Sequence, residues 1–301
     1  MPSQPPDIPA IRSLLLDQIF SAFARSLPRW LRFLLTPIFW PVAHKFARLL
    51  FQFDAQIAEN GIQKAAGWIL DHFVDSTRTS GIDHIPPAGP LLIAGNHPGA
   101  YDIFAQVSSL PRTDFRVIVS DEKLYRTLPH LHPYLIYVTH DPHNRMAAVR
   151  LMLEQLRQGS AIIIFPTGRV DPDPAFLPGA LEELDRWSSS LEILLRKIPE
   201  TCLVVAVTSG VLSPKILGHP LTHIPREPWQ QRKLAEFIQV MLQFAFGIKF
   251  RLVPCISFSQ GQQIGHSSHA KSREELQLAV HQQALTAMAD HMQVFYHASS
   301  S

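Results

Sequence analysis

The chain has 301 residues, of which 46% are hydrophobic and 17% charged. That composition provides enough apolar side chains for a sizeable core and excludes disorder as a description of the whole chain. With 27 basic and 25 acidic residues the net charge is only +2, so we expect no nucleic-acid partner bound through bulk charge. Two cysteines without a Cys-x-x-Cys pair exclude a disulfide framework and a thiolate zinc site.

Residues 1–77 form a segment that is predicted to be helical. Apolar residues recur at helical spacing over 11–26, and a further helix is predicted over 56–74. Between these stretches, prolines are expected to break the chain into short helices. They are Pro28, Pro37 and Pro41.

The same segment combines aromatic with basic residues, and no acidic residue occurs between Asp17 and Asp54. This mix suits a helix in an anionic membrane interface. A helical subdomain packed on the main domain, with solvated cations, explains it equally well. No run of 18 uncharged apolar residues and no basic leader occur, so we expect neither a spanning helix nor a secretory signal. The predicted location is cytoplasmic, peripheral on the inner face of a membrane.

From residue 78 to 301 the pattern changes to alternating strands and helices, which we treat as a second unit. Strands are predicted over 90–95, 115–120, 134–139, 161–165, 201–208 and 248–258. Helices are predicted over 101–110, 144–158, 181–198, 228–246 and 272–297. This alternation predicts an α/β fold, with a mostly parallel or mixed sheet flanked by helices. Functional residues are then expected in loops at the carboxyl ends of strands.

The strongest local signal is the stretch Gly95-Asn96-His97-Pro98-Gly99-Ala100-Tyr101-Asp102. Within one helix, His97 and Asp102 would point about 140° apart, but across a strand–loop–helix junction the two side chains can meet. Asp102 would then accept from one ring nitrogen of His97 and leave the other as a base. The competing interpretation is a helix-capping aspartate beside an incidental histidine.

A second loop follows the predicted strand over 161–165 and carries Thr167, Gly168 and Arg169. An arginine there can hold a phosphate with two hydrogen bonds, although an ordinary turn with a solvated arginine is the simpler interpretation. Asp171 and Asp173, in the Asp-Pro-Asp-Pro run that follows, are predicted to lie in a solvated loop, and the alternative is a short acidic insert that faces the entrance of a site.

Together these features resemble the glycerolipid acyltransferases, typified by lysophosphatidic acid and glycerol-3-phosphate acyltransferase. That family carries N-H-x-x-x-x-D, intact here from Asn96 to Asp102, and later F-P-E-G-T-R. The resemblance covers roughly residues 78–215. It places Lys123 at a lysine-rich helix start, residues 136–138 at an apolar second motif, and residues 204–207 at an apolar strand after the third motif.

This sequence departs from the family in two places. Thr167 stands where the third motif has Glu, and Gly168 is followed directly by Arg169. The second motif ends in Thr139 and His140 instead of Asp-Arg, with Arg145 a few residues on. Both departures fall on the part of the site that reads the acceptor's phosphate.

The resemblance implies an O-acyltransferase with His97 as general base, oriented by Asp102. Asn96, Lys123, Arg145, Thr167, Gly168 and Arg169 would bind substrate, and backbone N–H groups near Gly168 are candidates for holding the oxyanion. The donor would be acyl-CoA or acyl-carrier protein as co-substrate, without a further cofactor. The acceptor would be a lysoglycerolipid or glycerol 3-phosphate. Two alternatives stay open: a non-catalytic lipid-binding protein on the same fold, and an acyl thioesterase.

No metal is expected. His130, His132, His140 and His143 match no common zinc spacing.

Overall fold

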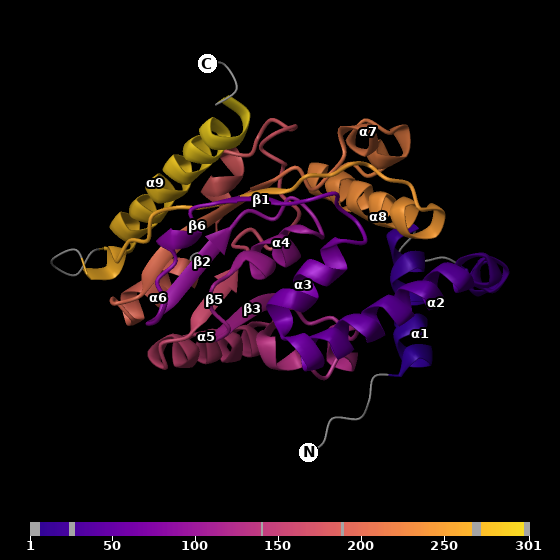
Figure 1. Cartoon of the computed structure of the whole chain (residues 1–301), viewed down its shortest axis with the longest axis horizontal. Helices are drawn as coiled ribbons and strands as arrows, with labels where there is room; N and C mark the ends of the chain where they lie inside the picture. The colour runs from indigo at the N-terminus through magenta and orange to yellow at the C-terminus, as the bar shows by residue number, and fades with distance from the viewer. Residues whose placement is uncertain (1–6, 24–27, 140, 188–189, 267–271, 298–301) are drawn as a thin grey trace.

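A seven-stranded sheet forms the centre of the protein (Figure 1). The computed structural model describes residues 7–23, 28–139, 141–187, 190–266 and 272–297. The strands are β1 (Arg78–Ser80), β2 (Leu91–Gly95), β3 (Phe115–Ser120), β4 (Leu135–Val138), β5 (Ala161–Ile164), β6 (Cys202–Ser209) and β7 (Cys255–Phe258). Their order is β1-β7-β6-β2-β5-β3-β4, and every neighbouring pair is parallel except β6 with β7. The predicted α/β class with a mixed sheet and an N-terminal helical segment is confirmed.

Helices surround this sheet. The α-helices are α1 (Ile8–Phe23), α2 (Arg29–Asn60), α3 (Ile62–Leu70), α4 (Asp102–Ser109), α5 (Pro142–Arg157), α6 (Ser190–Lys197), α7 (Pro214–Leu217), α8 (Pro228–Phe246) and α9 (Arg273–Met292). In Figure 1, α9 and the α1–α2 pair lie at opposite ends of the molecule.

The two faces of the sheet belong to different hydrophobic layers, because successive strand residues point to opposite sides. Leu91 and Ile93 of β2 pack in a core that includes residues of α2, α3 and α4. Leu92 and Ala94 pack instead with residues of α5, α6 and α9. With both faces covered, β2 and β5 are buried along their whole length, as expected for the central strands of a parallel sheet.

Of the three prolines predicted to break the N-terminal helices, Pro28 precedes the start of α2 as predicted, but the prediction was wrong for the other two. Pro37 and Pro41 lie inside the continuous α2, and the helix predicted over 56–74 is split at Gly61 between α2 and α3. Each proline removes a hydrogen bond to the carbonyl four residues earlier. Both prolines are exposed, as is Phe33, so the released carbonyls lie on the side that water reaches.

Two later predictions also needed correction. Only residues 255–258 of the strand predicted over 248–258 are in the sheet. Arg251 has a left-handed φ of 53° and Pro254 lacks an N–H, so the preceding segment cannot continue a regular ladder. The helix predicted over 181–198 is a 3-10 turn (Glu182–Arg186) and α6, interrupted at the extended Trp187.

The remaining predicted helices begin and end close to their predicted positions. Helix α8 matches its predicted bounds at both ends.

Residues of α3 share a hydrophobic core with the sheet. The division into units at residues 77 and 78 stays a prediction. Among the described residues, no helix combines the length and apolar character that crossing a bilayer requires.

Candidate active site

The predicted site residues lie after the carboxyl ends of parallel strands. His97 follows β2, Arg169 follows β5, and β5 pairs directly with β2. On the other side of β2, strand β6 ends at Ser209. Gly95, the last residue of β2, permits this close packing, because a Cβ there would lie 2.9 Å from the carbonyl oxygen of Ala206. Two loops far apart in sequence therefore meet at the edge of the sheet.

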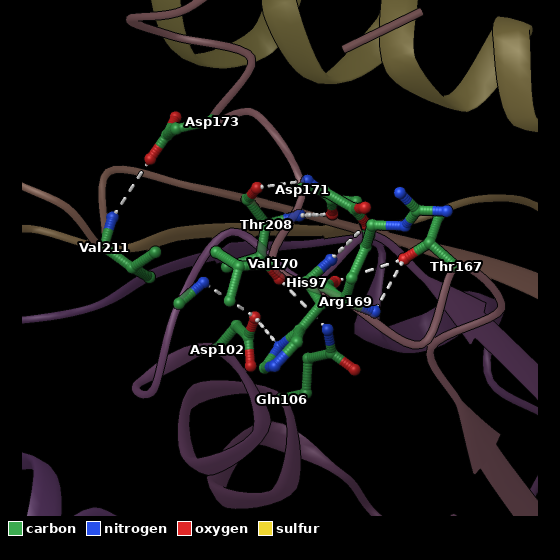
Figure 2. Close-up of polar contacts among 12 residues, drawn as sticks. His97, Asp102, Gln106, Thr167, Arg169, Val170, Asp171, Asp173, Thr208 and Val211 are labelled. Atoms are coloured by element: carbon green, nitrogen blue, oxygen red, sulfur yellow. Dashed lines mark hydrogen bonds and ion pairs between the residues drawn. The ribbon is translucent and has the colours of Figure 1, made fainter. Parts of the chain in front are cut away.

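His97 and Asp102 meet across the junction between β2 and α4. Nδ1 of His97 lies 2.7 Å from Oδ2 of Asp102 (Figure 2). The imidazole side chain is 27% exposed and the carboxylate is fully buried. The residue that caps α4 is Tyr101, and no side chain caps that helix end. Asp102 is therefore not a capping aspartate, and the contact expected from the five-residue spacing is present.

The electrostatic surroundings favour the protonated form of His97. Burial of the ring lowers its pKa, but the charge of Asp102 and its hydrogen bond outweigh this, with further contributions from Glu236 and Asp171. The net effect raises the pKa of His97 to about 9. Because Nδ1 faces Asp102, Nε2 is the nitrogen that can exchange a proton with a ligand. The ring of Phe165 lies against the imidazole, with centroids 4.7 Å apart.

Asp171, which sequence reasoning placed in a solvated loop, is 2% exposed and binds the backbone of His97. The N–H of His97 donates to Oδ2 of Asp171 at 2.9 Å, and the N–H of Asp171 donates to the carbonyl of His97 at 2.7 Å (Figure 2). Burial raises the pKa of the Asp171 carboxyl to about 6, although the His97 N–H opposes the shift. The loop after β5 thus holds the loop after β2 through two reciprocal bonds.

Asp173 is also buried, contrary to the prediction, and connects the same loop to the end of β6. Its Oδ2 accepts from the N–H of Gly210 at 2.8 Å and from that of Val211 at 3.3 Å. Burial raises the pKa of the Asp173 carboxyl to about 6. No local signal could have found these aspartates, because their partners lie in other loops.

Asn96, a predicted substrate-binding residue, lies buried against β6. It is 4% exposed, and its amide bonds the backbone of Thr208 in both directions, at 2.9 Å to the carbonyl and 2.8 Å from the N–H. One N–H and the carbonyl oxygen of the Asn96 amide therefore fix the end of β2 against β6. A substrate-binding role for Asn96 stays a prediction.

The loop with Thr167, Gly168 and Arg169 is held by its own contacts. The N–H of Gly168 donates to the carbonyl of Phe165, and the N–H of Arg169 contacts Oγ1 of Thr167 at 3.4 Å. These two N–H groups already have partners, so they are not the free oxyanion donors expected from the sequence. The guanidinium of Arg169 has no hydrogen-bond partner among the described residues, and it remains available to an anion.

Lys123 and Arg145 lie farther along the same edge of the sheet. Lys123 is exposed and follows β3, two strands from β2, whereas Arg145 lies in the first turn of α5, after β4. Strands β3 and β4 do not pair with β2, whose neighbours are β5 and β6.

Sequence reasoning missed Glu236 on α8. Burial raises the pKa of its carboxyl, while the nearby positive charge of His97 opposes the shift. The available signal was a row of polar residues at helical spacing, three of which interrupt the apolar second half of the helix: Arg232, Glu236, Gln239 and Gln243.

No protein-family model matches this sequence, and a comparison with curated proteins returns no match. Among solved structures, the chain is similar to the crystal structure of the 1-acyl-sn-glycerophosphate (LPA) acyltransferase, PlsC, from Thermotoga maritima. The two share 14% identity with a TM-score of 0.43, over 94% of this chain and 93% of that one. At this level the likeness by itself assigns neither activity nor substrate to this chain.

Proposed function

We propose that the protein is an O-acyltransferase that moves a fatty acyl group from a thioester to an alcohol, with His97 as general base. The observation that supports this most is the pairing of a solvent-accessible imidazole with a fully buried carboxylate at the carboxyl edge of the sheet. A thioester is already activated, so the reaction needs a base and correct positioning more than a covalent nucleophile.

In the proposed reaction, Nε2 of neutral His97 takes the proton of the acceptor hydroxyl. The hydroxyl oxygen attacks the thioester carbonyl, the C–S bond breaks, and the imidazolium returns the proton to the departing thiolate. Asp102 holds Nδ1–H throughout and stabilises the imidazolium. Asp171 fixes the backbone from which the imidazole projects.

The acceptor would be a lysoglycerolipid or glycerol 3-phosphate, and the donor acyl-CoA or acyl-carrier protein. Arg169 is the candidate to hold a phosphate of the acceptor, because its guanidinium has no partner within the described residues. Thr167 and Gly168 would shape the loop around Arg169. Lys123 would act only on the more distant parts of a ligand.

We further propose that the protein works on the inner surface of a membrane, through α2. Large apolar side chains project from one face of its first half, spaced three and four residues apart: Trp30, Phe33, Leu34 and Ile38, between 59% and 80% exposed. Exposed Arg29 and Arg48 add positive charge on the same helix. Figure 1 places this part of α2 at one end of the molecule, away from the sheet. An apolar face with nearby cations suits an anionic lipid surface.

The deciding assay incubates the full-length protein with acyl-CoA or acyl-carrier protein and a panel of alcohol acceptors. Free thiol and new ester are measured in the same samples. Thiol release that equals ester formation supports a transferase. Thiol without ester makes the protein a thioesterase, and neither product favours a lipid-binding protein.

A further inference from the structure

A polar stripe runs along the buried face of α8. Arg232 donates through Nε to the carbonyl of Val170 at 2.9 Å. Gln239 accepts from the N–H of Ser213 and donates to the carbonyl of Val211. One turn later, Oε1 of Gln243 accepts from the hydroxyl of Tyr101 at 2.7 Å. All three side chains are thus tied to the loops that build the candidate active site.

Glu236 is the member of this stripe whose carboxylate has no hydrogen bond or ion pair within the described part of the chain. Residues three and four apart share a helix face, so Glu236 lies between the contacts of Arg232 and those of Gln239. Val170 precedes Asp171, which binds the His97 backbone, and Tyr101 precedes Asp102. The helix therefore directs Glu236 toward the His97–Asp102 pair. The electrostatic influence of Glu236 on His97 agrees with this placement.

We propose that Glu236 is a specificity-determining residue that binds an ammonium group of the acyl acceptor beside His97. This inference rests on the proposed acyltransferase function. It narrows the acceptor to one with a zwitterionic headgroup, whose ammonium contacts Glu236 and whose phosphate contacts Arg169.

The charges of the site support this acceptor over a purely anionic one. Asp102, Asp171 and Glu236 all lie close enough to His97 to favour its protonated form. A purely anionic headgroup would add to this negative field. An ammonium group would offset it, provide the missing partner of Glu236, and favour the neutral form of His97 that a general base requires. Burial is the main cause that lowers the pKa of Arg232, four residues before Glu236, and the nearby charge of Arg169 contributes to the same shift. Arg169 is therefore the candidate partner for the phosphate end of such a headgroup.

The first test is equilibrium binding to the full-length protein by calorimetry. The probes are short-chain lysophosphatidylethanolamine, lysophosphatidic acid of the same chain, and free phosphoethanolamine. We expect the wild type to bind the first about tenfold or more tightly than the second, as for a hydrogen bond between charged groups. Glu236→Gln should abolish that preference with little change toward lysophosphatidic acid, and Glu236→Asp should retain part of it.

The control is Glu154→Gln, which neutralises an exposed glutamate on α5 and should keep the wild-type preference. Equal wild-type affinity for the two lysolipids, or an equal loss of both in Glu236→Gln, would overturn the proposal. If phosphoethanolamine alone binds in a Glu236-dependent way, the headgroup suffices. If only the lysolipid does, the acyl chain is also required, and either result supports the ammonium site.

The second test is acyl transfer to the same two lysolipids. We expect the preference to appear mainly as a lower KM for the ammonium-bearing acceptor and to disappear in Glu236→Gln. A Glu236-dependent binding preference without any transfer would reject the acyltransferase function and leave the ammonium site standing. Acyl transfer without that binding preference would support the acyltransferase function and reject the ammonium site.

Discussion

Two histidine–aspartate pairs in the described part of the chain have nearly the same local geometry. His97 Nδ1 lies 2.7 Å from Asp102, and His130 Nδ1 lies 2.8 Å from Asp54. Both carboxylates are fully buried, and both imidazoles are partly exposed, by 27% and 46%. A distance alone therefore does not distinguish a catalytic from a structural pair.

The remaining contacts of the two carboxylates differ. Asp54, on α2, also accepts from the backbone N–H groups of His130 and Leu131, both at 3.0 Å, so it anchors a distant loop to the helix. In Asp102, Oδ2 accepts from His97 and at 3.3 Å from Gly99, while buried Oδ1 has no partner among the described residues. The Asp54 pair joins segments, whereas the Asp102 pair orients one ring at the carboxyl edge of the sheet. We infer a structural role for the first and a catalytic role for the second.

The largest expected effect is the difference in kcat between alanine variants of the two histidines. His97→Ala should lower kcat for acyl transfer by roughly 10²–10⁴-fold, the usual contribution of a general base. His130→Ala should leave kcat within a few fold, because its imidazole holds a loop and not a substrate. The measurement is steady-state ester formation, with circular dichroism to check that both variants are folded. Substantial transfer by folded His97→Ala would reject the catalytic assignment.

Asp171→Ala tests whether the backbone of His97 must be fixed. Loss of the bond to the His97 N–H should reduce kcat by roughly 10–100-fold, since small misplacements of a catalytic group have effects of that size. Asp171→Asn keeps an acceptor oxygen at this position and should recover most of the activity. If Asn is as inactive as Ala, the charge of Asp171 matters and the positioning role is wrong.

Asp54→Ala tests the structural pair by its stability. The backbone N–H groups of His130 and Leu131 would lose their buried acceptor, at about 1 kcal/mol for each hydrogen bond. We expect a lower free energy of unfolding in urea, with kcat per folded molecule close to that of the wild type. A variant with full stability but little activity would reverse the roles assigned to the two pairs.

The pH dependence of acyl transfer should report on the protonation of His97 in the His97–Asp102 pair. Since its pKa is raised to about 9, His97 is protonated below that pH and becomes a base only as the pH rises. The value of kcat/KM should therefore increase with pH and level off above about 9. Glu236→Gln should shift this midpoint downward, because the negative charge of Glu236 raises the pKa of His97. A profile that falls across this range would contradict the general-base role.

The smallest effect concerns α2, which carries both Asp54 and the exposed apolar face. Phe33→Ser with Ile38→Ser removes two side chains that are 80% and 65% exposed, leaving both His–Asp pairs intact. We expect several-fold weaker co-sedimentation with anionic liposomes, and unchanged transfer to short-chain soluble acceptors. Equal sedimentation of the variant and the wild type would reject α2 as the membrane contact.

The sequence alone determined the α/β class, most strand and helix positions, and the partnership of His97 with Asp102. These depend on local hydrophobic periodicity and on a spacing of five residues, which a strand–loop–helix junction converts into contact. Continuity of α2 through Pro37 and Pro41 was not predictable in this way, because it depends on which helix face the solvent reaches.

Only the tertiary structure decided how the site is held together and what faces it. Asp171 reaches His97 across 74 residues, Asn96 reaches Thr208 across 112, and α8 brings Glu236 to a pair more than a hundred residues earlier. The local sequence around a buried aspartate does not differ from that around a solvated one. The environment that distinguishes them comes from chain segments that only folding brings together. For that reason Asp171 and Asp173 were misplaced from sequence, whereas His97 and Asp102 were not.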